Sequence, residues 1–247
     1  MTWAMTWATE FYAGKHVVIT GGTSGIGQGI GRAFADAGAT VHATGATQAE
    51  VEAATAAEPR FRYAVLDVRD KAAVQAFVGG LDGLDVLVNC AGIIRRGDEL
   101  DPDIFDLVVD VNLNGTMRLC AAARPLLARQ GGAILNTASL LSFFGGGLVP
   151  GYSASKGGIA QLTKSLAIAY AKDGIRVNAI APGWIATGFT EALRNDPSRN
   201  DPIIARTPLG RWGTPADLAP AALFLCSPLA GYITGAVLPV DGGYLIA

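Results

Sequence analysis

The sequence has little charge and no long hydrophobic run, and each scarcity excludes a class of protein. Charged residues make up 16% of the 247 residues and the formal net charge is −2, so the chain has no positive field to attract nucleic acid or an anionic membrane. No stretch of about 18 uninterrupted apolar residues occurs, so we expect no transmembrane helix. The first residues lack the basic segment and apolar core of a signal peptide, and we expect a cytoplasmic protein.

The chain also has few cysteines, and no two of them are close in the sequence. Neither a disulfide framework nor a zinc site has such spacing, so we expect reduced thiols in the core and no metal site. The three lie in apolar stretches, at Cys90, Cys120 and Cys226.

What the sequence has in quantity is hydrophobic residues, which make up half of it and can form one large core. From Lys15 onward, short β-branched runs alternate with longer Ala-rich amphipathic stretches. This alternation predicts an α/β fold of the Rossmann-type, doubly wound kind, with a seven-stranded, mostly parallel sheet and helices on both faces. The expected strands cover residues 16–20, 40–44, 60–66, 85–89, 133–137, 176–181 and 237–240.

No linker divides the chain, so we expect a single domain over residues 11–247. Residues 1–4 recur at once as residues 5–8, and we treat residues 1–10 as an N-terminal extension without an assigned function. Long helices are expected over 112–129 and 152–173.

A glycine-rich turn follows the first expected strand and opens the first helix, where residues 20–27 read TGGTSGIG. Gly21 permits a tight turn, Gly25 allows a pyrophosphate to approach the backbone, and Gly27 allows close packing of helix on strand. The free N–H groups and positive dipole end of the helix suit phosphate groups. The turn therefore predicts a dinucleotide site.

Several motifs in order along the chain resemble the short-chain dehydrogenase/reductase family, from Lys15 to the C-terminus. The glycine spacing is Gly-x-x-x-Gly-x-Gly, residues 89–92 read NCAG, and residues 152–156 read YSASK. Asn112, Ser139, Pro182, Gly183 and Thr187 complete the match. The resemblance implies an enzyme that moves a hydride between NAD(P) and a hydroxyl or carbonyl of a small molecule.

Four residues match the catalytic positions of that family. Tyr152 can act as general acid or base if its pKa is brought toward working pH, and Lys156 lies one helical turn away on the same face. Ser139 would hydrogen-bond the substrate oxygen, and the resemblance places Asn112 in a proton relay with Lys156. Taken singly, the Tyr–Lys pair could be a surface pair and the serine a turn residue.

The cofactor contacts implied by the resemblance fall on the glycine turn and on strand ends, although each could instead be ordinary strand-end chemistry. They are Gly21, Thr23, Ser24, Gly25, Ile26, Gly27, Thr44, Gly45, Asp67, Val68, Asn89, Ala91, Gly92, Tyr152, Lys156, Pro182, Gly183, Ile185 and Thr187.

The choice between NAD and NADP depends on the end of the second strand. An acid there would bind the ribose hydroxyls and repel a 2′-phosphate, but the residue is Gly45. The arginine frequent next in NADP enzymes is Ala46 here, while Ser24, Thr44 and Thr47 could hydrogen-bond a phosphate. The missing acid favours NADP, with incomplete discrimination.

Stretches outside these motifs resemble the branch containing 2-dehydro-3-deoxy-gluconate and gluconate dehydrogenases, which implies a sugar, sugar acid or polyol as substrate. They are residues 93–96, 140–146, 210–213 and 240–245. Substrate contacts are expected from Arg95, Leu141 and Trp184, and residues 184–212 fit a mobile lid. One arginine, at 95, 96, 194 or 211, could pair with a substrate carboxylate, although each could be a surface or inter-subunit residue.

Two other functions remain open. A 3-oxoacyl-acyl carrier protein reductase has the same core but needs a basic surface, for which Arg118, Arg124 and Arg129 offer only a thin patch. A non-catalytic nucleotide-sensing protein would need neither Tyr152 nor Ser139. The resemblance also implies a homotetramer, with interfaces on the two long helices and the last strand.

Overall fold

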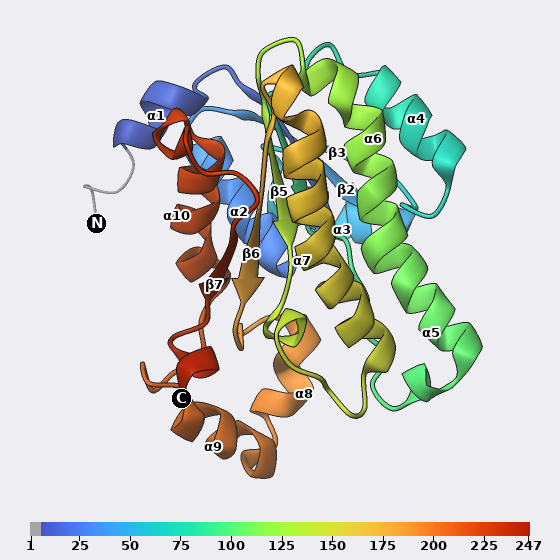
Figure 1. Cartoon of the computed structure of the whole chain (residues 1–247), viewed down its shortest axis with the longest axis vertical. Coiled ribbons are helices and arrows are strands. Elements are labelled where there is room, and N and C mark those ends of the chain that lie inside the picture. The colour runs from blue at the N-terminus through green and yellow to red at the C-terminus, as the bar shows by residue number, and fades with distance from the viewer. Residues whose placement is uncertain (1–5) are drawn as a thin grey trace.

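The computed structural model describes residues 6–247 and consists of a parallel sheet between two layers of helices (Figure 1). The sheet has seven strands in the order β3-β2-β1-β4-β5-β6-β7, and every neighbouring pair is parallel. The seven-stranded α/β fold predicted from the sequence is therefore confirmed, with a sheet that is parallel throughout. The strands are β1 (His16–Thr20), β2 (Thr40–Gly45), β3 (Arg62–Val65), β4 (Val86–Asn89), β5 (Ala133–Thr137), β6 (Arg176–Pro182) and β7 (Val237–Val240).

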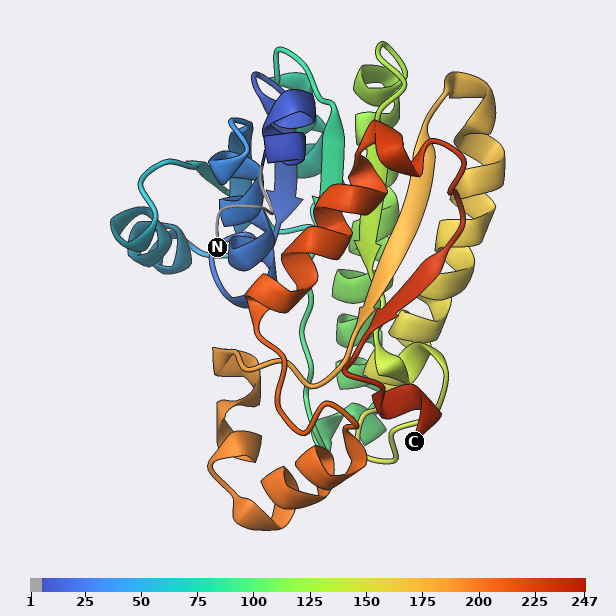
Figure 2. The same cartoon turned by 90° about the vertical axis from the view of Figure 1, so that its left-hand side faces the viewer.

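The helices form two layers because the crossovers between parallel strands place them over the sheet. Helices α2 (Gly25–Asp36) and α10 (Pro215–Cys226) pack on one face, while α4 (Lys71–Gly79), α6 (Gly115–Leu127) and α7 (Pro150–Tyr170) pack on the other (Figure 2). Each layer has its own apolar core against the sheet. The remaining helices are α1 (Thr6–Tyr12), α3 (Gln48–Ala57), α5 (Pro102–Val109), α8 (Glu191–Arg194) and α9 (Pro197–Arg206).

Helix starts are fixed by short polar side chains that accept free backbone N–H groups. Asp70 caps α4 through the N–H groups of residues 72 and 73, and Asp101 caps α5 in the same way. The helix expected over 112–129 does not begin at such a cap, and its bounds differ from the expected ones. A π-turn over Asp110–Asn114 continues α5 into α6, and α6 ends at Leu127. Such turns insert an extra residue and are frequent at functional sites.

Helix α1 joins the core on the side of α2 and α10. Ala8 is fully buried, and the Tyr12 ring meets the Phe34 ring edge to face at 4.8 Å. The Tyr12 hydroxyl donates to the carbonyl of Leu223 at 2.5 Å. Packing of the domain thus reaches back to Ala8, before the boundary expected at residue 11, whereas residues 1–4 of the repeat lie outside the described residues.

The helix lengths and the cysteines bear on the membrane and disulfide classes of protein considered in the sequence analysis. Over residues 6–247, no helix is long and apolar enough to cross a membrane. All three cysteines are free, and Cys120 and Cys226 are buried, as expected for reduced core thiols.

Candidate active site

The expected site residues gather at one edge of the sheet, where all seven parallel strands end. The register places Thr20, the last residue of β1, between Thr44 of β2 and Asn89 of β4. Strands β2 and β3 lie on one side of β1, and β4 and the later strands lie on its other side, so the strand order reverses at β1. Ligands of such sheets bind at this reversal. Helices α8 and α9 lie beyond the same edge (Figure 1).

The glycine turn has the shape that a dinucleotide requires. Gly21 has a φ of +63°, and a Cβ on it would lie 2.8 Å from the backbone nitrogen of Ala91. A Cβ on Gly27 would collide with the carbonyl oxygen of Gly21. Gly25 has a φ of +53° and faces the side chain of Thr187 across the opening. Only glycines fit this turn, and the N-terminus of α2 opens directly behind it, so these residues fit a pyrophosphate.

The other expected cofactor residues differ in what their side chains can reach. Thr44 is 1% exposed and Asn89 is 3% exposed. The Asn89 amide donates to the Asn136 side chain at 2.9 Å, so it ties β4 to β5. The Asp67 carboxylate pairs with Arg69 at 2.6 Å, and Val68 is buried against Gly115. Thr44 and Asn89 are thus held inside the sheet and reach the edge mainly through their backbone.

The buried Asn112 side chain connects the π-turn to the segment after β4. Its Oδ1 accepts the Ile93 N–H at 2.8 Å, and its Nδ2 donates to the Ile93 carbonyl at 3.0 Å. The same Nδ2 donates to the Ser155 hydroxyl at 3.1 Å. Asn112 therefore holds the segment after β4 against the second turn of α7.

Tyr152, Lys156 and Ser139 meet at the edge as expected. The Lys156 ammonium lies 5.5 Å from the centroid of the Tyr152 ring and donates to the Thr137 carbonyl at 2.6 Å. Ser139 follows β5 by two residues and accepts the Leu141 N–H at 3.2 Å, which holds its hydroxyl near the phenol. The pair on α7 therefore lies at the sheet edge beside Ser139 and is not an exposed surface pair.

Burial sets the proton affinities of this pair in the protein alone. Burial raises the pKa of Tyr152 to about 12, hydrogen bonding from Ser139 opposes the rise, and the charge of Glu99 adds to it. Burial also lowers the pKa of Lys156 to about 8, while the nearby Cys90 opposes that change. Both side chains consequently favour their neutral forms more than they would in water.

Glu99 is a residue that the sequence analysis missed. It is 1% exposed, and its two oxygens accept the backbone N–H groups of Arg95 and Tyr152, each at 2.7 Å. This carboxylate clasps the loop after β4 to the first turn of α7. The sequence signal was weak, because an acid in a polar segment is usually exposed.

The expected substrate residues lie on the segments that follow β4, β5 and β6. Arg95 is exposed, Leu141 is half-buried, and Trp184 packs edge to face on Trp212 at 5.7 Å and on Tyr244 at 6.1 Å. The Trp184 indole nitrogen is buried without a protein partner. The aromatic cluster joins the start of the 184–212 segment to its end and to the C-terminus.

The other three arginines considered for a substrate carboxylate differ in the groups that they contact. Arg211 is held by both oxygens of Asp217 at 2.8 and 2.9 Å, so it is already paired. Arg194 reaches the Thr187 carbonyl at 3.4 Å. Arg96 is exposed, and burial and the nearby charge of Arg199 on α9 both lower its pKa. The charges of Arg96 and Arg199 are thus near enough to repel each other.

Comparison with known proteins assigns the chain to a protein family. A family model described as enoyl-(acyl carrier protein) reductase, adh_short_C2, matches residues 21–245. The 2-dehydro-3-deoxy-D-gluconate 5-dehydrogenase of Pseudoalteromonas atlantica is 44% identical over 244 residues, which are 94% of this chain and 96% of that protein. The chain belongs to the short-chain dehydrogenase/reductase family.

Two other members show the range of this family. A gluconate 5-dehydrogenase from Burkholderia cenocepacia, solved in complex with NADP and tartrate, is 33% identical with a TM-score of 0.89, covering 97% of this chain and 99% of that one. A 3-oxoacyl-[acyl-carrier-protein] reductase of Chlamydia muridarum is 37% identical over 241 residues, covering 93% of this chain and 96% of that protein. This short-chain dehydrogenase/reductase is an NAD(P)-dependent oxidoreductase.

Proposed function

We propose that the chain oxidises a hydroxyl of a sugar acid, or reduces the corresponding ketone, with Tyr152 as general acid and base. The observation that carries the proposal is the meeting of Tyr152, Lys156 and Ser139 at the sheet edge, in a chain 44% identical to a protein named for a deoxy sugar acid. The glycine turn, the Ala91–Gly92 backbone and Thr187 would hold the dinucleotide.

Bound NAD(P) supplies or accepts the hydride. During reduction, Tyr152 gives a proton to the oxygen on which negative charge develops, and during oxidation it takes that proton. The Ser139 hydroxyl donates to the same oxygen and stabilises its charge. The Lys156 ammonium, 5.5 Å from the phenol ring, favours tyrosinate and so opposes the effect of burial on the pKa of Tyr152. Asn112 keeps the Ile93 backbone and Ser155 in place around this pair.

The positive charge at the opening supports an anionic substrate. Arg96, on the loop after β4, lies near Arg199 of α9. A carboxylate between these two guanidinium groups relieves their repulsion and gains charge-assisted hydrogen bonds. Because Arg199 belongs to the 184–212 segment, a bound sugar acid would draw this segment toward the sheet edge, as a closing lid does.

We also propose that copies of the chain associate as a homotetramer. Strand β7 ends the sheet, so one of its sides has no neighbouring strand. Ile168 of α7 is 81% exposed and Leu229, before β7, is 57% exposed. A second copy seated on this edge would cover an open strand and apolar side chains that water now contacts.

The test is absorbance at 340 nm with both dinucleotides, offered with deoxy sugar acids, sugar acids and polyols, and with acetoacetyl thioesters for reduction. We expect turnover of a sugar acid, lowered at least about 1000-fold in Tyr152→Phe, because the hydroxyl that moves the proton is gone. Dinucleotide binding should persist. Tyr170→Phe is the matched control, since Tyr170 is a buried tyrosine at the other end of α7.

Each other outcome assigns a different function. Turnover confined to acyl thioesters indicates a 3-oxoacyl reductase. Dinucleotide binding without turnover of any compound indicates a nucleotide-sensing protein. Full activity in Tyr152→Phe contradicts the role of this residue.

A further inference from the structure

The end of β2, where dinucleotide enzymes of this fold place an acid, is tightly packed against neighbouring side chains. The residue is Gly45, and a Cβ there would lie 2.6 Å from Cγ2 of Thr23 in the glycine turn. Real Cβ atoms do not approach so closely, so a side chain at position 45 would require the Thr23 methyl group to shift. The packing at this position disfavours an acid, so its absence alone says little about the preferred dinucleotide.

A carboxylate reaches the same space from another element. Glu50, in the first turn of α3, places Oε2 only 3.1 Å from the position of a Cβ on Gly45. The same oxygen accepts the Ala46 N–H at 2.8 Å. The carboxylate of an aspartate at position 45 would be one bond beyond that Cβ. The Glu50 carboxylate therefore lies close to the place that such a carboxylate would occupy.

Some of the groups that could bind a 2′-phosphate here are engaged or buried, and others are exposed hydroxyls. The Ala46 N–H is taken by Glu50, and the Thr47 hydroxyl accepts the Glu50 N–H at 3.3 Å as the cap of α3. Thr44 is 1% exposed. Ser24 and Thr47 are exposed, so their hydroxyls could still donate to a phosphate, but they carry no positive charge to offset that of Glu50.

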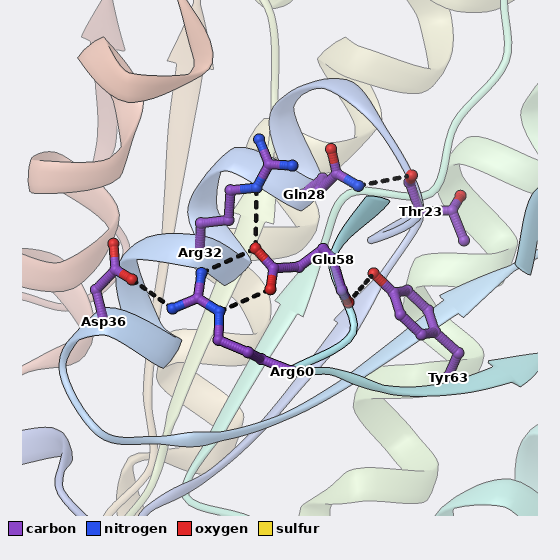
Figure 3. A network of polar contacts seen from close by, with 7 residues as sticks. All are labelled: Thr23, Gln28, Arg32, Asp36, Glu58, Arg60 and Tyr63. Atoms are coloured by element: carbon purple, nitrogen blue, oxygen red, sulfur yellow. Dashed lines mark hydrogen bonds and ion pairs between the residues drawn. The ribbon is translucent and has the colours of Figure 1, made fainter. Parts of the chain in front are cut away.

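The arginines of α2 and of the turn before β3 are also paired (Figure 3). Arg32 of α2 donates to Glu58 at 3.2 Å, and Arg60 binds Glu58 at 2.7 Å and Asp36 at 2.6 Å. These two cations and two carboxylates balance in charge. Farther along the edge, Arg69 is held by its ion pair with Asp67. None of these arginines is therefore free to offset the charge of Glu50.

We propose that Glu50 selects NAD over NADP in this chain, by accepting the ribose hydroxyls and repelling a 2′-phosphate. The inference rests on the proposed oxidoreductase function. It reverses the preference that the missing acid at Gly45 favours when the sequence is considered alone. Glu50 acts as the acid at the strand end does in related folds, but from the next helix.

The experiment is a fluorescence titration of the whole protein with NADH and with NADPH, without substrate. Wild type is expected to bind NADH at least about tenfold more tightly than NADPH, because the phosphate meets a fixed negative charge. In Glu50→Gln, the amide oxygen still accepts the Ala46 N–H but the charge is gone. NADPH binding should then tighten about tenfold, with a smaller loss for NADH.

Glu52→Gln is the matched control, because Glu52 is an exposed acid of the same helix that bonds Gln48 at 2.9 Å. It removes the same charge and should leave the ratio of the two affinities unchanged. NADPH binding as tight as NADH binding in wild type, or an unchanged ratio in Glu50→Gln, overturns the inference. If neither dinucleotide binds, the proposed function falls with it. If NADH binds selectively but no sugar acid is turned over, the inference stands and the substrate assignment fails.

Discussion

The loops after β2 and β4 use the same device with different results. In each, a glutamate accepts a backbone N–H from the residue four positions earlier, Ala46 with Glu50 at 2.8 Å and Arg95 with Glu99 at 2.7 Å. Glu50 is exposed, whereas Glu99 is 1% exposed. One loop thus keeps its carboxylate in water and the other encloses it.

The difference follows from what each carboxylate meets on its second side. Glu99 also accepts the Tyr152 N–H, so it joins the loop after β4 to the helix that carries Tyr152, the proposed general acid and base. A buried charge is tolerated there because both of its oxygens are bonded. Glu50 lies at an open edge, where its charge can act on a ligand. Burial therefore gives Glu99 a positioning role, and exposure suits Glu50 to selection between ligands.

The largest effect on activity is expected from a substitution of Glu99. We expect Glu99→Ala to lower kcat about 100-fold, because the first turn of α7 loses the acceptor of the Tyr152 N–H and small displacements of reacting groups are costly. NADH affinity should change little. Asp98→Asn, an exposed acid of the same turn, is the control and should keep its kcat.

Glu99→Gln separates the charge of this residue from its packing. Besides Glu99, Lys156 and Ser139 face Tyr152, and the Glu99 charge adds to the rise in the pKa of Tyr152 caused by burial. Removing the charge lowers that pKa, so the pH dependence of kcat for oxidation should move to lower pH. A purely structural role would leave the profile in place. Unchanged kcat and pH profile in both variants would contradict the positioning role.

A second prediction concerns stability on the side of the sheet that carries Glu50. Glu58 is 6% exposed and bound by Arg60 and Arg32, and hydrogen bonding from Arg60 is the main reason why its pKa falls to about 2 (Figure 3). Glu58→Gln should lower the free energy of unfolding by about 2 kcal/mol at pH 7, measured with urea. Kinetic constants at the sheet edge should not change.

The stability difference between wild type and Glu58→Gln should depend on pH. A carboxylate whose pKa is lowered by folding stabilises the fold at pH values above its ordinary pKa of 4.5, and that contribution is lost as the pH falls toward 2. The deficit of Glu58→Gln should therefore shrink at pH 3. Asp36→Asn breaks an exposed pair with Arg60 and should cost at most about 0.5 kcal/mol. Equal deficits for Glu58→Gln at pH 7 and pH 3 would rule out the charge as the cause.

The smallest expected effect lies on the outer side of the loop after β4. Arg96→Gln should raise KM for a sugar acid about tenfold and leave KM for a neutral polyol unchanged, because only the acid carries a carboxylate. Steady-state kinetics with both substrates measure this. Arg129→Gln, an exposed arginine after α6, is the control. Equal effects on both substrates would show that Arg96 does not read charge.

The meeting of the proposed catalytic residues could be predicted because they lie on or directly after regular elements. Tyr152 and Lys156 are one turn apart on α7, and Ser139 follows β5 by two residues, so helix and strand geometry brings them to one edge. The pairing of Arg211 with Asp217 could not be foreseen, because it depends on how the 184–212 segment folds back toward α10. The same holds for the approach of Arg96 to Arg199.

The sequence by itself determined the order of strands and helices, the glycine turn and the positions of the proposed catalytic residues. These depend on local periodicity and on backbone space, which neighbours in the chain define. Only the tertiary structure decided that Thr44 and Asn89 point into the sheet, that Glu99 is buried, and that Glu50 occupies the space beside Gly45. A side chain's charge acts through the groups around it, and those groups come from elements far apart in the sequence.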